Sequence, residues 1–224
     1  MARDAYQAEL AALREDVVEF GETVSGRLDD ALDALETNDD DLATAVIDGD
    51  EEINERYLEL ESRCVDLFAL QQPVASDLRL VTASFKIITE LERIGDLATN
   101  LSACARSVEE LHFSDTSLVD VGRLAREMLD DALDAYATDD PDIATAVFER
   151  DDELDGLCER VAEHVIRDLV ETTTTFDGEE MQGLLTEVNR LLLTLRDIER
   201  AGDHAVNIAA RSFYMVTNET TLLY

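Results

Sequence analysis

The chain has 224 residues, of which 46% are hydrophobic, and its 53 acidic residues against 18 lysines and arginines give a formal net charge of -35. The apolar fraction can fill a packed core, which excludes a disordered acidic tail. The charge excludes nucleic acid as a partner, because phosphate backbones are bound by clustered lysines and arginines.

Six long segments show apolar residues at helical spacing, and none shows the alternation that is typical of a strand. We therefore predict helices over residues 4–37, 40–71, 74–112, 115–138, 141–171 and 179–216. Helices of about 30 residues must pack lengthwise against one another, because propensity alone does not stabilise them.

Short polar segments separate these predicted helices. Asn38-Asp39-Asp40 and Asp139-Asp140-Pro141 read as turns that lead into N-caps, with Pro141 at a first helical position where its missing N–H costs nothing. Gln71-Gln72-Pro73 and Asp177-Gly178 precede the third helix of each half.

The segment Leu28–Asp50 repeats as Leu129–Asp151 at a constant offset of 101, with 15 of 23 positions identical. A second match aligns residues 92–100 with 199–207 at an offset of 107. The sequence is therefore duplicated. We predict an all-α protein made of two tandem homologous three-helix bundles, with domains at residues 1–112 and 113–224.

Three cysteines, Cys64, Cys104 and Cys158, lie far apart and are odd in number, so we expect buried thiols without a disulfide or a zinc site. No apolar run has the roughly 18 residues of a membrane span, and the N-terminus lacks the apolar core of a signal peptide. We expect a cytoplasmic protein that does not insert into the membrane.

The positive charge is almost all arginine, since Lys86 is the single lysine. A surface crowded with Asp and Glu suits a protein that must stay hydrated in concentrated salt, where a Debye length of roughly 3 Å removes the self-repulsion. We therefore expect the protein to come from an extreme halophile.

Rows of acidic and amide side chains recur at matching places in both copies, inside otherwise apolar helices. The rows are Glu92 with Asp96 and Asn100, Glu199 with Asp203 and Asn207, Asp50 with Asn54, and Asp151 with Asp155. Gly95 and Gly202 lie inside the first two rows, and each costs about 1 kcal/mol relative to alanine in a helix interior. We expect these glycines to allow close approach of a neighbouring helix or a bound group.

If the second and third helices of each copy pack together at these rows, each copy gathers several oxygen ligands and few nitrogens. Clustered carboxylates repel one another and favour a hard cation such as Mg, Ca, Mn or ferric iron. The alternative is that these acids are solvated and paired with Arg93 and Arg200.

These residues together resemble the PhoU family of phosphate transport accessory and regulatory proteins. The resemblance rests on Gln72–Arg79 leading into Leu91–Asp96, on Ile198–Asp203 with Asn207-Ile208, and on the rows that begin at Asp50 and Asp151. It covers essentially the whole chain.

The resemblance implies a pair of three-helix bundles, each binding divalent or trivalent metal ions, with Fe, Mn, Mg or Zn as candidates. The implied ligands are Asp50, Glu92 and Asp96 in the first copy and Asp151, Asp155, Glu199 and Asp203 in the second. Asn54 departs from the pattern, because it stands where a second carboxylate would complete the first site.

The resemblance also implies a function without catalysis. Family members are negative regulators of phosphate uptake that dock to the ATPase subunit of the phosphate ABC transporter and, in bacteria, to a phosphate-sensing histidine kinase. Docking to the transporter would place the chain at the membrane periphery. The long helix faces of the duplicated bundles favour a homodimer.

Two alternatives remain at this point. One is a carboxylate-bridged metal enzyme, for which a di-iron bundle would need a Glu-x-x-His motif on two helices. A single such motif, Glu109 with His112, is present, and no nucleophile-base pair or phosphate-binding loop accompanies it. The other alternative is a helical adaptor whose acids never bind metal.

Overall fold

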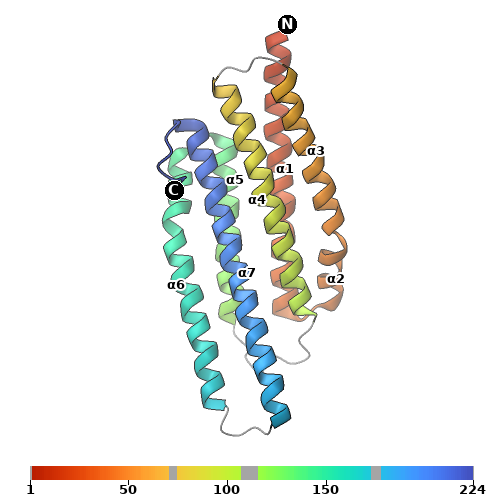
Figure 1. Ribbon diagram of the computed structural model, residues 1–224, viewed down its shortest axis with the longest axis vertical. Coiled ribbons are helices and arrows are strands. Elements are labelled where there is room, and N and C mark those ends of the chain that lie inside the picture. The colour runs from red at the N-terminus through yellow and green to blue at the C-terminus, as the bar shows by residue number, and fades with distance from the viewer. Residues whose placement is uncertain (1, 71–74, 107–115, 173–177, 224) are drawn as a thin grey trace.

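The computed structural model of the protein describes residues 2–70, 75–106, 116–172 and 178–223. In this part of the chain the elements are α1 (Ala2–Thr37), α2 (Asp40–Asp48), α3 (Asp50–Leu70), α4 (Ala75–Ala105), α5 (Thr116–Thr138), α6 (Pro141–Thr172) and α7 (Gly178–Thr217). The long helices run lengthwise along the molecule (Figure 1). The predicted all-helical class is confirmed.

The prediction of one continuous helix over residues 40–71 is wrong, because the helix is divided into α2 and α3 at Gly49. The Arg27 guanidinium of α1 donates to the Val46 carbonyl at the end of α2, and it occupies the space that a side chain at residue 49 would need. In the second copy, Arg150 stands at the position that matches Gly49, and its Nη1 atom lies 2.7 Å from Oδ2 of Asp131 on α5. The helix α6 therefore continues without a break.

The predicted turns before α2 and α6 are confirmed. Asn38 and Asp139 adopt left-handed backbone conformations, with φ of 53° and 58°. Asp39 is the N-cap of α2, where its carboxylate accepts from the Leu42 N–H at 3.0 Å. Asp140 accepts the Asp142 N–H at 2.9 Å, and Pro141 opens α6 as predicted.

The third predicted helix, over residues 74–112, is shorter than expected in the described part of the chain. Here α4 ends at Ala105 and Arg106 lies in a turn, whereas residues 107–112 are outside the described residues. The Arg106 Nε pairs with the Asp40 carboxylate at 2.8 Å, so the end of α4 is tied to the first turn of α2.

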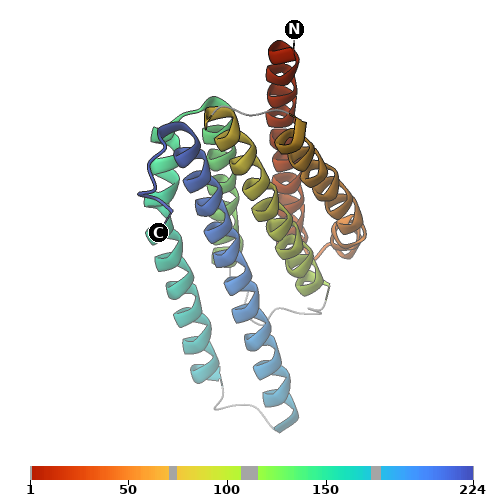
Figure 2. The same ribbon diagram turned by 45° about the horizontal axis from the view of Figure 1, so that its top comes forward.

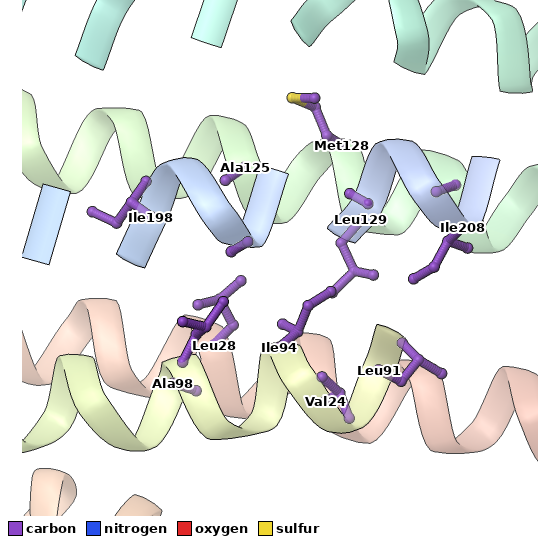
Figure 3. Packing of buried hydrophobic residues seen from close by; sticks show 14 of the residues in the cluster. Val24, Leu28, Leu91, Ile94, Ala98, Ala125, Met128, Leu129, Ile198 and Ile208 are labelled. Carbon is purple, nitrogen blue, oxygen red and sulfur yellow. The ribbon is translucent and has the colours of Figure 1, made fainter. Parts of the chain in front are cut away.

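The two halves share one hydrophobic core. Helices α1 to α4 form the first half and α5 to α7 the second, and α4 packs on α7 while α1 packs on α5. Figure 3 shows this junction, where Leu28 and Ile94 of the first half face Leu129 and Ile198 of the second. All four side chains are fully buried or nearly so. The duplicated bundles are therefore fused side by side and not merely linked.

The three cysteines are buried, and no disulfide joins them in the described residues, as predicted. Burial raises the pKa of Cys64 and of Cys158 to about 12 in each case. Cys104 accepts a hydrogen bond from the Thr194 hydroxyl at 3.0 Å. These thiols therefore pack as small apolar groups.

No helix in the described ranges combines the length and the apolar character that a membrane span requires.

Candidate metal centres

Two seams between helices carry the acidic rows. The helices α6, α7, α4 and α3 lie in this order across one face of the molecule, with α5 and α1 behind them (Figures 1 and 2). The carboxylates of the first copy lie on α3 and α4, which pack against each other, and those of the second copy lie on α6 and α7, which also pack against each other. Each copy therefore brings its second and third predicted helices together, as expected.

The glycine inside each row lets the two helices of a seam approach closely. A Cβ on Gly95 would lie 3.0 Å from Ile53 Cγ2, and a Cβ on Gly202 would overlap the side chain of Leu154. Ile53 and Leu154 hold matching positions in the two copies. The expected close approach of a neighbouring helix is confirmed at both glycines.

The first cluster consists of Asp50 on α3 with Glu92 and Asp96 on α4. Both oxygens of Asp50 accept hydrogen bonds from neutral donors. The Thr99 hydroxyl donates to Oδ1 at 3.1 Å, and the Asn54 amide donates to Oδ2 at 3.1 Å. Two neutral donors thus hold the Asp50 carboxylate in place.

Burial and mutual repulsion raise the pKa values of two members of the first cluster. Desolvation and then the charge of Asp96 raise the pKa of Glu92, and Asp50 adds to this effect. Desolvation and then Asp50 raise the pKa of Asp96. Arg93, whose Nε lies 3.4 Å from the Glu92 carboxylate, opposes both shifts. The cluster therefore holds more negative charge than the nearby arginine offsets.

The second cluster consists of Asp151 and Asp155 on α6 with Glu199 and Asp203 on α7. Desolvation, followed by repulsion from Asp155 and Asp203, raises the pKa of Asp151 to about 6. Desolvation and then Asp155 raise the pKa of both Glu199 and Asp203. Oδ1 of Asp151 is buried and has no hydrogen-bond partner in the described part of the chain.

A hard cation fits these features, because it would relieve the repulsion and give the buried oxygen of Asp151 a partner. The side chains are not gathered around a common point, however. Among the described residues no group of three or more His, Cys, Asp or Glu side chains is arranged to hold a metal ion. The structure thus brings the predicted residues to the same seams, and their assignment as ligands stays a prediction.

A polar contact lies between the two clusters, where α4 of the first half packs on α7 of the second. His204 Nδ1 lies 2.7 Å from Glu90 Oε2, and the Asn207 amide donates to the same oxygen at 3.4 Å. Asn207, the last member of its predicted row, therefore binds Glu90. The sequence pattern did not single out Glu90, because its partners come from the other half of the chain.

The two alternatives to a metal-binding regulator concern the arginines beside the acidic rows and the single Glu-x-x-His motif. Arg93 pairs with Glu92 as the solvated-acid alternative expects, whereas Arg200 pairs with Asp197 at 3.4 Å. Glu109 and His112, the single di-iron-like motif, lie outside the described residues.

A family model supplies the deciding comparison. The model described as "PhoU domain" matches residues 17–105 and again residues 118–212. The chain belongs to the PhoU family. The match to two copies agrees with the internal duplication, while the boundaries at residues 1–112 and 113–224 stay a prediction.

Known PhoU proteins are similar over nearly the whole chain. The "Phosphate-specific transport system accessory protein PhoU" of Serratia marcescens is 35% identical over 218 residues, which cover 96% of this chain and 85% of the relative. The Escherichia coli (strain K12) protein of the same name is also 35% identical, with coverage of 96% and 86%.

Solved PhoU structures share the fold. The crystal structure of PhoU from Pseudomonas aeruginosa has a TM-score of 0.86 at 31% identity, covering 96% of this chain and 100% of that one. The PhoU structure from Streptococcus pneumoniae has a TM-score of 0.85 at 25% identity, covering 96% and 99%. These relatives are bacterial and give no support to the expected halophilic origin.

Proposed function

We propose that this protein is a non-enzymatic accessory regulator of phosphate-specific transport, which lowers phosphate uptake by docking to the ATPase subunit of a phosphate ABC transporter. The observation that carries the proposal is the match of both halves to the PhoU domain, together with accessory proteins of phosphate-specific transport that align over 96% of the chain. The near-complete coverage of those relatives, at 85% and 86% of their own length, supports the same role for the whole chain.

The proposal includes metal ions at the two seams. Asp50, Glu92 and Asp96 would hold an ion in the first half, and Asp151, Asp155, Glu199 and Asp203 would hold one in the second. The raised pKa values and the unpartnered oxygen of Asp151 support this assignment. A bound divalent or trivalent cation, Fe, Mn, Mg or Zn, supplies positive charge that allows an acidic face to meet an anionic group.

The proposal also places the protein in the cytoplasm, at the membrane periphery when it is bound to the transporter. We propose a homodimer as the acting form, because the long outer faces of the helices offer room for a second copy. In an organism that has a phosphate-sensing histidine kinase, that kinase would be a further partner.

An affinity capture tests the docking. The tagged chain is incubated with lysate from phosphate-replete cells of its own source, at the salt concentration of that cytoplasm, and captured proteins are identified by mass spectrometry. The phosphate transporter ATPase is the expected partner.

The control for this capture is a tagged helical protein of similar size and net charge, because a charge of -35 attracts basic proteins without specificity. Repeated capture without any transport component, or equal capture of the ATPase by the control, would contradict the docking proposal.

A further inference from the structure

The exposed large hydrophobic side chains gather on one layer of helices, formed by α6, α7, α4 and α3 (Figures 1 and 2). Every such side chain in the described ranges lies on one of these four helices, and none lies on α1 or α5. From Ala11 to the end of α1, by contrast, the exposed charged residues are all acidic: Glu15, Glu19, Glu22, Asp30 and Glu36. Apolar side chains gathered on one side of a protein mark a contact surface.

The packing of the two central helices directs their exposed side chains outward. Helix α4 packs on α1, α3 and α7, and helix α7 packs on α4, α5 and α6. The exposed residues Leu78 of α4 and Leu185 of α7 therefore lie on the remaining side, which is the outer side of the layer. We call this side the four-helix face.

The two edge helices of the layer also turn apolar side chains outward. On α3, Arg63 forms an ion pair with α1, and Val65 lies two residues further, about 200° around the helix. On α6, Arg150 forms ion pairs with α5, and Ile166 lies sixteen residues further, about 160° around the helix. Val65 and Ile166 are therefore on the sides of their helices that point away from α1 and α5.

These exposed apolar positions repeat in the duplication. Val65 corresponds to Ile166 at the offset of 101, and Leu78 corresponds to Leu185 at the offset of 107. The exposed fractions are 53% and 48% in the first pair and 43% and 45% in the second. Each copy thus has one apolar patch: the first patch is Val65 with Leu78, and the second patch is Ile166 with Leu185.

Other exposed positions beside the patches have changed between the copies. Ser62 and Asp66 lie beside Val65, and their counterparts in the second copy are Glu163 and Arg167. Exposed valine and leucine gain nothing from contact with water, so a surface without a partner has no reason to keep them while its polar residues change. The repetition of the patches therefore points to a contact made twice.

The two patches lie at opposite ends of the four-helix face, because α4 and α7 run in opposite directions (Figure 1). Near the start of α4, Arg79 Nε donates to the Met215 carbonyl near the end of α7 at 3.2 Å. Near the end of α4, Cys104 accepts from the Thr194 hydroxyl of α7 at 3.0 Å. The layer order α6, α7, α4, α3 also reads the same outward from its centre in both directions. An approximate two-fold rotation therefore relates the two patches.

A second copy of this chain does not fit the four-helix face. Asp203 is exposed on the outer side of α7, and Asp155 is exposed on the same side of α6 as Ile166, about three turns away. Desolvation and then Asp155 already raise the pKa of Asp203. Two copies meeting at this face would set acidic rows against acidic rows, which is unfavourable. The partner is therefore a different protein with basic groups, and the proposed homodimer would use another surface.

We propose that the four-helix face binds a two-fold symmetric homodimer, with the first patch on one subunit and the second patch on the other, so that one chain bridges the pair. Each subunit of the partner offers an apolar contact flanked by lysine or arginine. This inference rests on the proposed function, in which the partner is the pair of ATPase subunits of the phosphate ABC transporter. Two linked contacts bind such a pair more tightly than one contact binds a single subunit.

Binding to the purified transporter tests the inference. The phosphate ABC transporter of the same source, in detergent and with both ATPase subunits, is immobilised and titrated with the chain, and the affinity is measured by biolayer interferometry. Light scattering during size-exclusion chromatography gives the molar mass of the complex. The expected complex has one chain for each pair of ATPase subunits.

Two double variants remove one patch each. Val65→Asn with Leu78→Asn removes the first patch, and Ile166→Asn with Leu185→Asn removes the second. Each is expected to weaken binding by a similar factor of at least about tenfold, because a single remaining contact has no linked partner. The variant with all four substitutions is expected to lose binding.

A matched control is Ala11→Asn with Thr23→Asn, at exposed positions of α1, which is expected to bind as wild type. Circular dichroism and thermal melting check the fold. The single variants Leu78→Asn and Leu185→Asn replace any double variant that is misfolded.

The outcomes separate this inference from the proposed function. Loss of affinity in only one double variant, two chains for each transporter, or equal affinity of all variants would overturn the inference and leave docking intact. Patch variants that change the oligomeric state of the chain alone, with unchanged transporter affinity, would overturn it by showing that a second copy occupies this face. A wild-type chain that does not bind the transporter would overturn both the docking proposal and this inference.

Discussion

Ile53 of α3 packs directly against Gly95 of α4, with its Cγ2 atom 3.0 Å from the place where a Cβ at residue 95 would lie. The contact recurs in the second half, where Leu154 of α6 occupies the space beside Gly202 of α7. These two pairs hold the helices of each seam close together, and the acidic rows lie on these same helices.

Gly202→Ala is expected to destabilise the protein, although alanine favours a helix by about 1 kcal/mol over glycine. The new methyl group would overlap the side chain of Leu154, which is fully buried and must move within a packed core. Overpacking of this kind costs about 1–3 kcal/mol, so we expect a net loss of about 1 kcal/mol in the free energy of unfolding, measured by urea denaturation.

Gly183→Ala on the same helix is the matched control. A Cβ at Gly183 meets no atom within 4 Å, so the variant is expected to gain stability from helix propensity alone. If both variants gave the same stability, the glycine at residue 202 would have no packing role.

The pKa of Asp151 predicts how stability depends on pH in metal-free buffer. Because the folded-state pKa is about 6 and the ordinary value is 3.8, the folded protein retains this proton between about pH 4 and pH 6 while the unfolded chain releases it. Stability therefore falls as the pH rises through this window, and the loss remains at higher pH.

Asp151→Asn is expected to remove this loss and to raise the free energy of unfolding at pH 8 by about 1 kcal/mol, since solvent screens part of the repulsion. Below about pH 4, the charge of Asp151 is expected to cause little difference in the free energy of unfolding between wild type and Asp151→Asn. Asp66→Asn, at an exposed position of α3 in the other half, is the control and is expected to leave the pH dependence as in wild type. Equal pH profiles for wild type and Asp151→Asn would refute the prediction.

The net charge of -35 predicts that salt stabilises the fold. Self-repulsion among exposed carboxylates is screened as the Debye length falls from about 10 Å at 0.1 M to about 3 Å at 1 M. We expect the melting temperature to rise steeply with NaCl below about 1 M and to level off above it. A melting temperature that does not change between dilute buffer and 2 M NaCl would count against both screening and the expected adaptation to salt.

A buried hydrogen bond joins the two halves, and its removal is expected to cost stability. The hydroxyls of Ser84 on α4 and Tyr136 on α5 lie 2.7 Å apart, and both side chains are fully buried. Ser84→Ala leaves the Tyr136 hydroxyl unpartnered and is expected to cost about 1–3 kcal/mol, whereas Tyr136→Phe leaves Ser84 bonded to the Leu80 carbonyl and is expected to cost about 1 kcal/mol.

The double variant completes a thermodynamic cycle, measured by denaturant unfolding. A coupling energy near zero between the two positions would show that this hydrogen bond does not stabilise the junction.

Much of the fold was predictable because its signals are local. The Asp39 cap, the turns at Asn38 and Asp139, and Pro141 at the start of α6 depend on residues within one turn of each other. The break at Gly49 was not predicted, because it depends on Arg27, a residue of another helix. Thr99 was overlooked as a partner of Asp50 for the same reason, although its replacement by Val206 in the repeat was a usable signal.

The amino-acid sequence by itself determined most of the helices, their duplication and the glycines inside the acidic rows, since each follows from residue spacing along the chain. Its motifs gave the resemblance to the PhoU family, which the match to the PhoU domain then confirmed. Only the tertiary structure decided that the two halves share one core, that Glu90 meets His204, and that Asp50 finds two donors while Asp151 has an oxygen without one. Such contacts depend on which side chains face each other across a seam, and packing between helices sets that arrangement.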